Sequence, residues 1–191
     1  MNTLKVFSKI PPVDIDDFIQ EELYNRMPQN IKSVLSDKNS PKRMLSLLGW
    51  DLLAENLRDK NLLSIVDFEE KGKPFIPNSN VHFNISNTKG MVVLVIHNRP
   101  VGIDVERLRT PRENIFSRVF CPEEISSIDC AESFTRLWTR KEAVVKLFGG
   151  GVSMGLTSFS VLTDKFEAFG KSVEIKPVLI DGFISHLAIY S

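Results

Sequence analysis

Long apolar runs are the first feature that this sequence lacks. No stretch approaches the roughly 18 consecutive apolar residues that cross a membrane as a helix, so we expect no membrane-spanning segment. The first five residues, 1–5, are not followed by an apolar run either, and we therefore expect no signal peptide.

Cysteine and histidine are scarce. The chain of 191 residues has two cysteines, Cys121 and Cys130, and three histidines. Neither cysteine belongs to a C-x-x-C pair and no histidine lies at zinc-finger spacing, so a structural zinc site is not supported. Two cysteines are too few for a disulfide framework that would hold a chain of this size together, and we expect free thiols in a reducing cytoplasm. We interpret the histidines, which lie in strand-like segments, as structural or surface residues: His82, His97 and His186.

An excess of charge of one sign is also missing. The 24 basic residues balance the 24 acidic residues, so the basic surface that a nucleic-acid-binding protein needs is not expected. Hydrophobic residues make up 42% and charged residues 25%, which is typical of a soluble globular protein. Any anionic ligand must therefore be held by a local cluster of positive groups.

The apolar spacing predicts an α+β fold in two halves, 1–98 and 99–191. In the first half we expect a strand over 4–10, a helix over 14–27 and a second helix from Ser40-Pro41 to about residue 58. Turn residues between segments 81–86, 91–97 and 101–106 predict three strands in an antiparallel meander.

The second half is predicted to hold a short helix after Pro122 and a longer one over 134–148. Ser133 is the expected N-cap of the longer helix, and the glycine run 149–151 is expected to end it. Strands are expected over 157–162, 173–180 and 186–190. Each half then has helices followed by an antiparallel sheet.

Two carboxylates occupy alternate positions of a predicted strand. Asp104 and Glu106 share one face of that strand, because side chains at i and i+2 point the same way. Paired carboxylates repel each other unless a cation lies between them, and oxygen ligands of this kind suit Mg²⁺. The alternative, a solvated strand end, is the commoner case for so short a motif.

A second group lies on the predicted helix over 134–148. Trp138, Glu142 and Lys146 are spaced i, i+4 and i+8, so they follow one side of the helix. Glu142 could supply a third metal ligand or accept a proton, and Lys146 could hold a phosphate. The alternative is a surface Glu–Lys pair, although the large Trp138 on the same side indicates a partly buried face.

Three further segments carry polar groups that could bind phosphate or an acidic partner. Lys73 lies in a turn before Pro74, and the turn 86–90 offers hydroxyl, amide and backbone donors. The alternatives are a surface loop and a plain hairpin turn. A basic stretch could steer an acidic partner or could be a solvated loop, and its members are Arg107, Arg109, Arg112 and Arg118.

These segments together resemble the 4′-phosphopantetheinyl transferase superfamily, in its Sfp-type branch. The resemblance lies in Phe-Asn-Ile-Ser at 83–86, Gly-Ile-Asp-Val-Glu at 102–106 and Trp-Thr-Arg-Lys-Glu-Ala-Val-Val-Lys at 138–146. Gly-Lys-Pro at 72–74 and Ser-Phe-Ser-Val at 158–161 also match, so the pattern runs from about residue 72 to 161.

The resemblance implies a pseudodimer of two similar α+β halves that bind coenzyme A between them. It implies Mg²⁺, or Mn²⁺, held by Asp104, Glu106 and Glu142, with Lys146 on the diphosphate. The nucleotide side of coenzyme A would be held by Lys73, Pro74, Ser86, Asn87 and Arg43. The implied reaction moves phosphopantetheine to a serine of an acyl or peptidyl carrier protein, with 3′,5′-ADP as the other product. Glu142, Lys146 and Asp104 would be the catalytic residues, in a monomer without nucleic-acid or membrane partners.

One residue departs from the family pattern. Asn87 stands where the family usually has His, and an amide can donate a hydrogen bond but never carries a positive charge. A weakened module that only binds coenzyme A or a carrier protein is therefore an alternative. A nucleotide hydrolase is a second alternative, but the sequence lacks a Walker-type phosphate loop. Fatty-acid, polyketide and peptide-synthetase carriers all stay open.

Overall fold

The computed structural model describes residues 4–12, 17–35, 40–111, 113–150 and 155–191. The chain divides into two compact units, Met1–Asn98 and Arg99–Ser191, and each is described by itself. Each unit has its own apolar core. No helix in the described residues is long and apolar enough to cross a membrane. The fold is α+β, as the sequence predicts.

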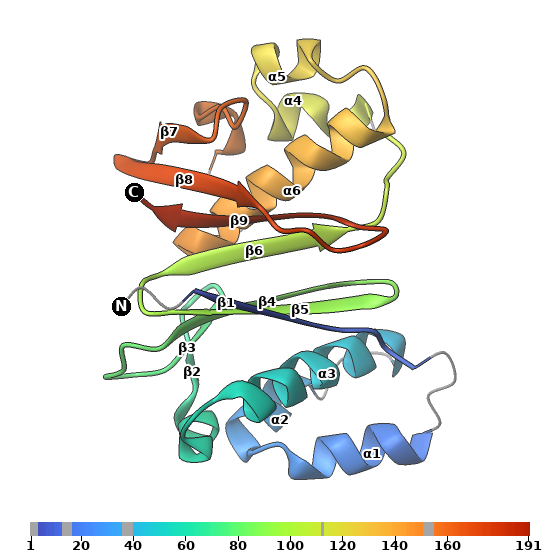
Figure 1. The fold of residues 1–191 in the computed structure, drawn as a ribbon, viewed down its shortest axis with the longest axis vertical. Coiled ribbons are helices and arrows are strands. Elements are labelled where there is room, and N and C mark those ends of the chain that lie inside the picture. The colour runs from blue at the N-terminus through green and yellow to red at the C-terminus, as the bar shows by residue number, and fades with distance from the viewer. Residues whose placement is uncertain (1–3, 13–16, 36–39, 112, 151–154) are drawn as a thin grey trace. The chain divides into compact units, whose positions relative to one another are not determined.

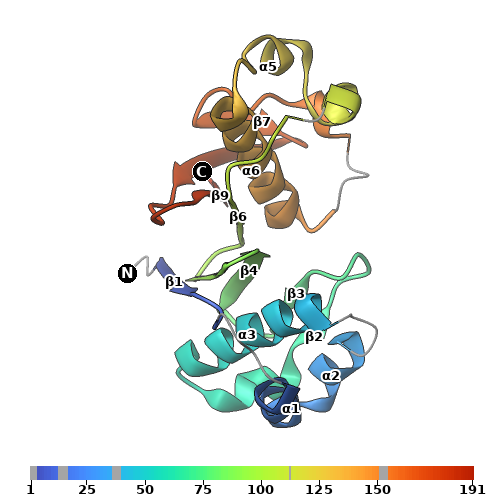
Figure 2. The ribbon, with the colours of Figure 1, turned by 90° about the vertical axis from the view of Figure 1, so that its right-hand side faces the viewer.

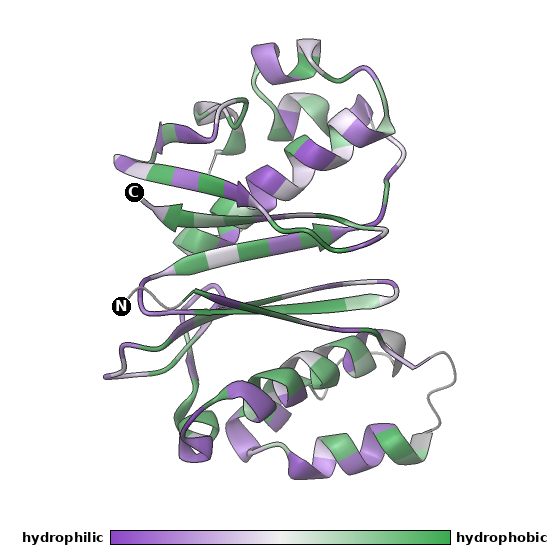
Figure 3. Cartoon of the chain, in the orientation of Figure 1, coloured by the Kyte–Doolittle hydropathy of each residue, from purple (hydrophilic) through white to green (hydrophobic). Residues whose placement is uncertain are grey.

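The first unit is built on a three-stranded antiparallel sheet with the order β1-β5-β4. Its strands are β1 (Lys5–Lys9), β4 (His82–Thr88) and β5 (Met91–His97). The central strand β5 is apolar along most of its length (Figure 3), and its residues from Met91 to Val95 are buried. Both strands expected over 81–86 and 91–97 are thus confirmed.

Helices cover one face of this sheet. Helix α3 (Ser40–Asn56) lies along the sheet, and α1 (Asp17–Arg26) and α2 (Gln29–Leu35) pack on α3 (Figures 1 and 2). Lys9 of β1 reaches Asp51 at 2.7 Å and Glu55 at 2.9 Å, which ties the edge strand to α3. The apolar spacing did not predict α2 or three short elements: η1 (Lys60–Ile65), β2 (Asp67–Phe68) and β3 (Pro74–Phe75). The first residues of the helix expected over 14–27 lie outside the described residues.

The second unit contains a four-stranded antiparallel sheet with the order β6-β9-β8-β7. Its strands are β6 (Val101–Glu106), β7 (Lys165–Ala168), β8 (Lys171–Pro177) and β9 (Ile184–Tyr190). The long helix α6 (Ala131–Phe148) packs on β6 and β9 (Figure 1). The remaining elements are η2 (Glu113–Ile115), α4 (Phe116–Val119), α5 (Pro122–Ser126) and η4 (Leu156–Ser158).

Two sequence predictions about strands were wrong. Strand β6 does not extend a meander with β5 but pairs with β9, so the turn at 98–100 joins two sheets. Segment 157–162 is not a strand: η4 occupies its start, and the strand lies later, at Lys165–Ala168. Side chains of α6 donate hydrogen bonds to several backbone carbonyls of this segment, which therefore do not pair with a strand.

Helix α6 begins three residues earlier than predicted. Its N-cap is Cys130, whose Sγ accepts the Ser133 N–H at 3.5 Å, while Ser133 Oγ accepts the Cys130 N–H at 3.1 Å. Ser133 is therefore the third helical residue of a reciprocal cap. Gly149 ends the helix with φ of 73°, in the left-handed region that glycine favours.

Candidate active site

Strand β6 and helix α6 approach each other most closely at Gly102. A Cβ atom on Gly102 would lie 2.1 Å from the carbonyl oxygen of Ala143 and 2.3 Å from the backbone nitrogen of Leu147. Only glycine permits this backbone contact. The contact brings the C-terminal half of α6, which carries Glu142 and Lys146, against the strand that carries Asp104.

Asp104 and Lys146 form a direct ion pair across this contact. Nζ of Lys146 lies 2.7 Å from Oδ1 of Asp104, whose side chain is buried. On the same face of β6, Glu106 is paired with Arg109 at 2.8 Å. Both predicted strand carboxylates are therefore held by cations from the chain itself.

Glu142 lies in the electrostatic field of the same groups. Burial raises the pKa of its carboxyl group above the usual range, and the charges of Asp104 and Glu106 raise it further. Lys146 and Arg109 oppose this shift. The predicted catalytic helix face is partly buried, with Trp138, Glu142 and Lys146 all half-exposed. The structure thus brings Asp104, Glu106, Glu142 and Lys146 into one interacting group.

The donor set has the chemistry that Mg²⁺ prefers. The charges of Asp104 and Glu106 raise the pKa of Glu142, so a cation beside these carboxylates would be favoured, and carboxylate oxygen is the ligand type of hard divalent ions. Within the described ranges, no three His, Cys, Asp or Glu side chains already stand together as a metal-binding group. The ligand set Asp104, Glu106 and Glu142 stays a prediction that fits the residues present.

The first unit has its own small pocket at the predicted nucleotide-binding residues. Pro74 and Asn87 line a pocket of about 150 Å³ together with Trp50 and Asn84. Lys73 precedes Pro74 and is half-buried, and burial lowers the pKa of its ammonium group, while Glu69 opposes this shift. Ser86 is buried beside Asn87 on β4.

Arg43, the fifth predicted contact, is placed on α3. Its guanidinium lies 4.1 Å from the centre of the Tyr24 ring and 3.9 Å from Glu21 of α1. These contacts fix the side chain between two helices of the first unit. Its predicted contact with a nucleotide stays a prediction.

The second unit contains the region that matches a known protein family. The family model of the 4′-phosphopantetheinyl transferase superfamily matches residues 100–181. The 4′-phosphopantetheinyl transferase gsp of Aneurinibacillus migulanus is 30% identical over 164 residues, which span 77% of this chain and 68% of that protein. The chain belongs to the 4′-phosphopantetheinyl transferase superfamily.

Other members of the superfamily match over shorter regions. The 4′-phosphopantetheinyl transferase Sfp of Bacillus subtilis is 36% identical over 100 residues, which span 49% of this chain and 45% of Sfp. The transferase AcpT of Escherichia coli K12 is 36% identical over 121 residues, which span 58% of this chain and 60% of AcpT. The matched regions thus span about half the length of several curated relatives.

A buried ion pair next to Glu142 in the sequence was not predicted. Nζ of Lys141 lies 2.9 Å from Glu124 of α5, and neither side chain is exposed. Lys141 also donates to the carbonyl of Leu156 at 2.8 Å and to that of Phe159. Glu124 accepts the N–H of Val161 at 2.7 Å. This pair joins α5, α6 and the segment after η4.

Arg140 holds the same segment one residue earlier in α6. Its Nε donates to the carbonyl of Val161 at 2.6 Å, and its guanidinium reaches the carbonyl of Thr163 and the carboxylate of Asp164. Side chains of the Trp-Thr-Arg-Lys-Glu-Ala block thus point toward two different parts of the second unit. Arg140 and Lys141 anchor the segment 156–164, whereas Glu142 faces β6.

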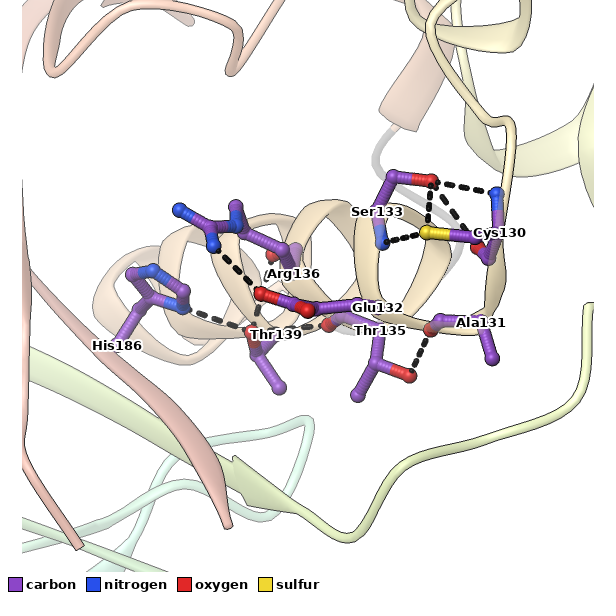
Figure 4. A network of polar contacts seen from close by, with 8 residues as sticks. All are labelled: Cys130, Ala131, Glu132, Ser133, Thr135, Arg136, Thr139 and His186. Carbon is purple, nitrogen blue, oxygen red and sulfur yellow. Dashed lines mark hydrogen bonds and ion pairs between the residues drawn. The ribbon is translucent and has the colours of Figure 1, made fainter.

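A third buried contact fixes α6 on the sheet. Nδ1 of His186 lies 2.8 Å from Oγ1 of Thr139 (Figure 4), and His186 is the ladder partner of Asp104 on β9. The Thr139 hydroxyl donates to helix carbonyls of Thr135 and Arg136 at 3.0 Å. When the single hydroxyl proton is donated to either carbonyl, Oγ1 accepts from a protonated Nδ1 of His186, so the direction of this hydrogen bond follows the tautomer of the ring. Burial, with Arg140 and Arg136, lowers the pKa of His186 to about 4.

Two arginines of the predicted basic stretch contact aromatic rings of the second unit. The guanidinium of Arg107 lies 4.7 Å from the centre of the Phe183 ring, and that of Arg109 lies 4.6 Å from the centre of the Trp138 ring. Arg118 is exposed, and Arg112 lies outside the described residues. Phe120 is fully buried in the core, so it offers no apolar surface to a partner.

Proposed function

We propose that this chain transfers the 4′-phosphopantetheine moiety of coenzyme A to a serine of an acyl or peptidyl carrier protein, with 3′,5′-ADP released. The observation that carries this proposal is the interacting group on β6 and α6, made of Asp104, Glu106, Glu142 and Lys146. It lies within the region that matches the superfamily. The first unit, residues 1–98, would contribute the nucleotide side, and residues 99–191 the metal and carrier side.

We propose that Asp104, Glu106 and Glu142 hold a divalent cation, Mg²⁺ or Mn²⁺. When bound, the cation would offset the negative charge that develops on the diphosphate leaving group. The chain would supply further positive charge through Lys146, whose ammonium group lies beside Asp104 and would donate to phosphate oxygens.

Glu142 is the proposed proton acceptor for the serine hydroxyl. A carboxyl group whose pKa is raised by burial and by neighbouring carboxylates is a stronger base than an ordinary glutamate. Because Gly102 and the Thr139–His186 contact fix α6 on the sheet, Glu142 keeps its position relative to Asp104. Positioning of the reacting groups then supplies much of the rate enhancement.

The first unit is proposed to bind the nucleotide phosphates of coenzyme A. Lys73 would supply charge, while Ser86 and Asn87 would supply hydrogen bonds near Pro74. The lowered pKa of Lys73 supports this role, because a half-buried ammonium group gains from an anionic partner. Arg43 would act at the edge of the same ligand.

The carrier protein is proposed to be acidic around its serine, so that exposed groups such as Arg107 and Arg118 attract it. Cys121 and Cys130 are both free, which is compatible with the proposed work in the cytoplasm. A monomer is the proposed active form.

The second candidate function is a module that binds coenzyme A or a carrier without turnover, and Asn87 is the residue that favours it.

Intact-mass spectrometry tests the proposed reaction. An apo carrier protein is incubated with this protein, coenzyme A and Mg²⁺, and the expected result is a mass gain of one phosphopantetheine. A parallel reaction with excess chelator should show no gain. Fatty-acid, polyketide and peptide-synthetase carriers are compared, since the preferred class decides the pathway. Binding of coenzyme A without any mass gain would favour the binding module and contradict the transferase.

A further inference from the structure

A second pocket of the first unit lies apart from the predicted coenzyme A residues. It has a volume of about 250 Å³ and lies where the C-terminal end of α3 meets the ends of β1 and β5. None of its lining residues belongs to the pocket of Pro74 and Asn87. The family-matching region, 100–181, does not include it.

The floor of this pocket is aliphatic. Leu57 is buried, while Leu62, Val81 and Ile96 are partly buried at the margin of the core, so all four expose apolar surface to the pocket. A cavity of about 150 Å³ lined by aliphatic side chains can hold a benzene molecule. The volume here therefore suits a small aromatic or branched ligand with one polar group.

The rim of the pocket is cationic. Lys5 and Arg58 both line it, and neither forms an ion pair in the described part of the chain. The one acidic lining residue, Asp59, uses its Oδ1 to accept the N–H of Asn61 at 3.0 Å. The rim thus has a net charge of one positive unit and can attract a monoanion.

The walls are held by contacts that do not need a ligand. Asn56 donates from Nδ2 to the carbonyl of Leu52 at 2.8 Å, and the N–H of Leu57 bonds to the carbonyl of Leu53 at 2.9 Å. The N–H of Val81 donates to Oγ of Ser79 at 3.0 Å. A preformed pocket loses less conformational entropy when it binds a ligand.

We propose that this pocket binds a small monocarboxylate with an apolar body about the size of a phenyl ring. The body would lie on the aliphatic floor, and the carboxylate would lie at the rim between Lys5 and Arg58. The site differs in position and in ligand chemistry from the phosphate-binding set at Lys73 and Asn87. It does not rest on the proposed transferase activity.

Titration of the full-length chain by NMR with three probes tests this site. Benzoate has the body and the charge, benzamide has the body alone, and acetate has the charge alone. Benzoate should cause saturable shifts at Leu57, Leu62, Val81 and Ile96, with a dissociation constant on the order of 1 mM, a normal affinity per atom for so small a ligand. Benzamide should bind about two- to fivefold more weakly, as expected for a lost exposed charge pair, and acetate should not saturate.

Two variants test the cationic rim. Arg58→Gln should weaken benzoate binding about two- to fivefold and leave benzamide binding unchanged. Lys42→Gln is the matched control, because Lys42 is exposed near the other end of α3 and lies outside the pocket. The absence of saturable shifts at the four floor residues would overturn the site. Equal affinity for benzoate and benzamide, or an equal effect of Lys42→Gln, would overturn the role of the rim.

Discussion

Lys141 and Glu124 form a 2.9 Å ion pair from which solvent is excluded on both sides. Such a pair contributes to stability only while both charges and their other hydrogen bonds are present. Here the carbonyls of Leu156 and Phe159 and the N–H of Val161 complete those hydrogen bonds. The pair therefore holds α5, α6 and the segment 156–161 together.

Replacement of Lys141 by methionine should strand the Glu124 carboxylate in the core. Lys141→Met is expected to lower the free energy of unfolding by about 3–5 kcal/mol, the usual cost of an uncompensated buried charge. Urea denaturation measures the change. Lys176→Met is the control, because its pair with Glu174 is partly exposed and should cost less than about 1 kcal/mol. Similar losses in both variants would show that the buried pair is not special.

Gly102 should not tolerate even a methyl group. In Gly102→Ala the new Cβ would meet backbone atoms of α6 at 2.1 Å and 2.3 Å, and backbone cannot rotate away as a side chain can. We expect a loss of about 3 kcal/mol, at the upper end of overpacking costs, and a drop in transferase activity as α6 moves away from Asp104.

Gly49→Ala is the matched control for this substitution. Its new Cβ would lie 2.7 Å from Cγ2 of Ile85, a methyl group on a stiff β-branched side chain, so this side chain must rotate or shift to relieve the contact. Alanine also favours the helix by about 1 kcal/mol over glycine. The expected loss of unfolding free energy is therefore smaller than for Gly102→Ala, because a side chain and not the backbone of α6 must move. An equal loss for both variants would contradict the close approach of α6 to β6.

His186 should make stability depend on pH in a defined window. Its pKa is about 4 in the folded protein, against an ordinary value of 6.5, because of burial and of the charges of Arg140 and Arg136, which Asp164 partly offsets. Below pH 6.5 the unfolded chain binds the extra proton, so the unfolding free energy should fall as pH drops from about 6.5 to 4. The full effect is on the order of 3 kcal/mol.

The variant His186→Asn isolates this contribution. Its amide can still donate to Thr139 but does not titrate. Urea unfolding of both proteins at several pH values between 4 and 7 should show a shallower pH dependence in the variant. Parallel curves for the two proteins would mean that His186 is not buried in the neutral form.

Glu142→Gln should separate activity from stability. The change removes the proposed base and one proposed ligand, so the transfer rate should fall by at least about 100-fold. The unfolding free energy should stay equal or increase, because the raised pKa shows that the charged form is disfavoured at this position. Glu132→Gln is the control, since Glu132 pairs with Arg136 on the exposed side of α6. Full activity in Glu142→Gln would exclude the proposed role.

The sequence was sufficient to predict the longer helices, most of the strands and the side of α6 that carries Glu142 and Lys146. Strand and helix periods placed Asp104 with Glu106, and Glu142 with Lys146, on shared faces. The pairing of β6 with β9 was not predictable, because the two strands are about 80 residues apart and turn residues at 98–100 favour a local hairpin.

The strand prediction for segment 157–162 was wrong for a different reason. Phe159 and Val161 alternate as in a strand and are indeed buried. Their carbonyls, however, accept hydrogen bonds from the side chains of Lys141 and Arg140 instead of a neighbouring strand. Nothing in the alternation distinguishes a backbone that bonds to strands from one that bonds to buried cations. For the same reason, the structural role of Arg140 and Lys141 could not be predicted from the family motif at 138–146 that contains them.

Asn87 decides between the transferase and the binding module. Asn87 lines the small pocket with Pro74, so a larger ring there would remain beside the proposed phosphate site. Asn87→His should keep transferase activity and lower the KM for coenzyme A, with a stronger effect below pH 6.5, where imidazole gains a positive charge. Steady-state kinetics at pH 6 and pH 8 measure this. If the chain is inactive and Asn87→His restores transfer, the natural protein is the binding module. If Asn87→His instead destroys the activity of an active chain, the amide has a role of its own in coenzyme A binding, because histidine offers the same hydrogen bond in a different position.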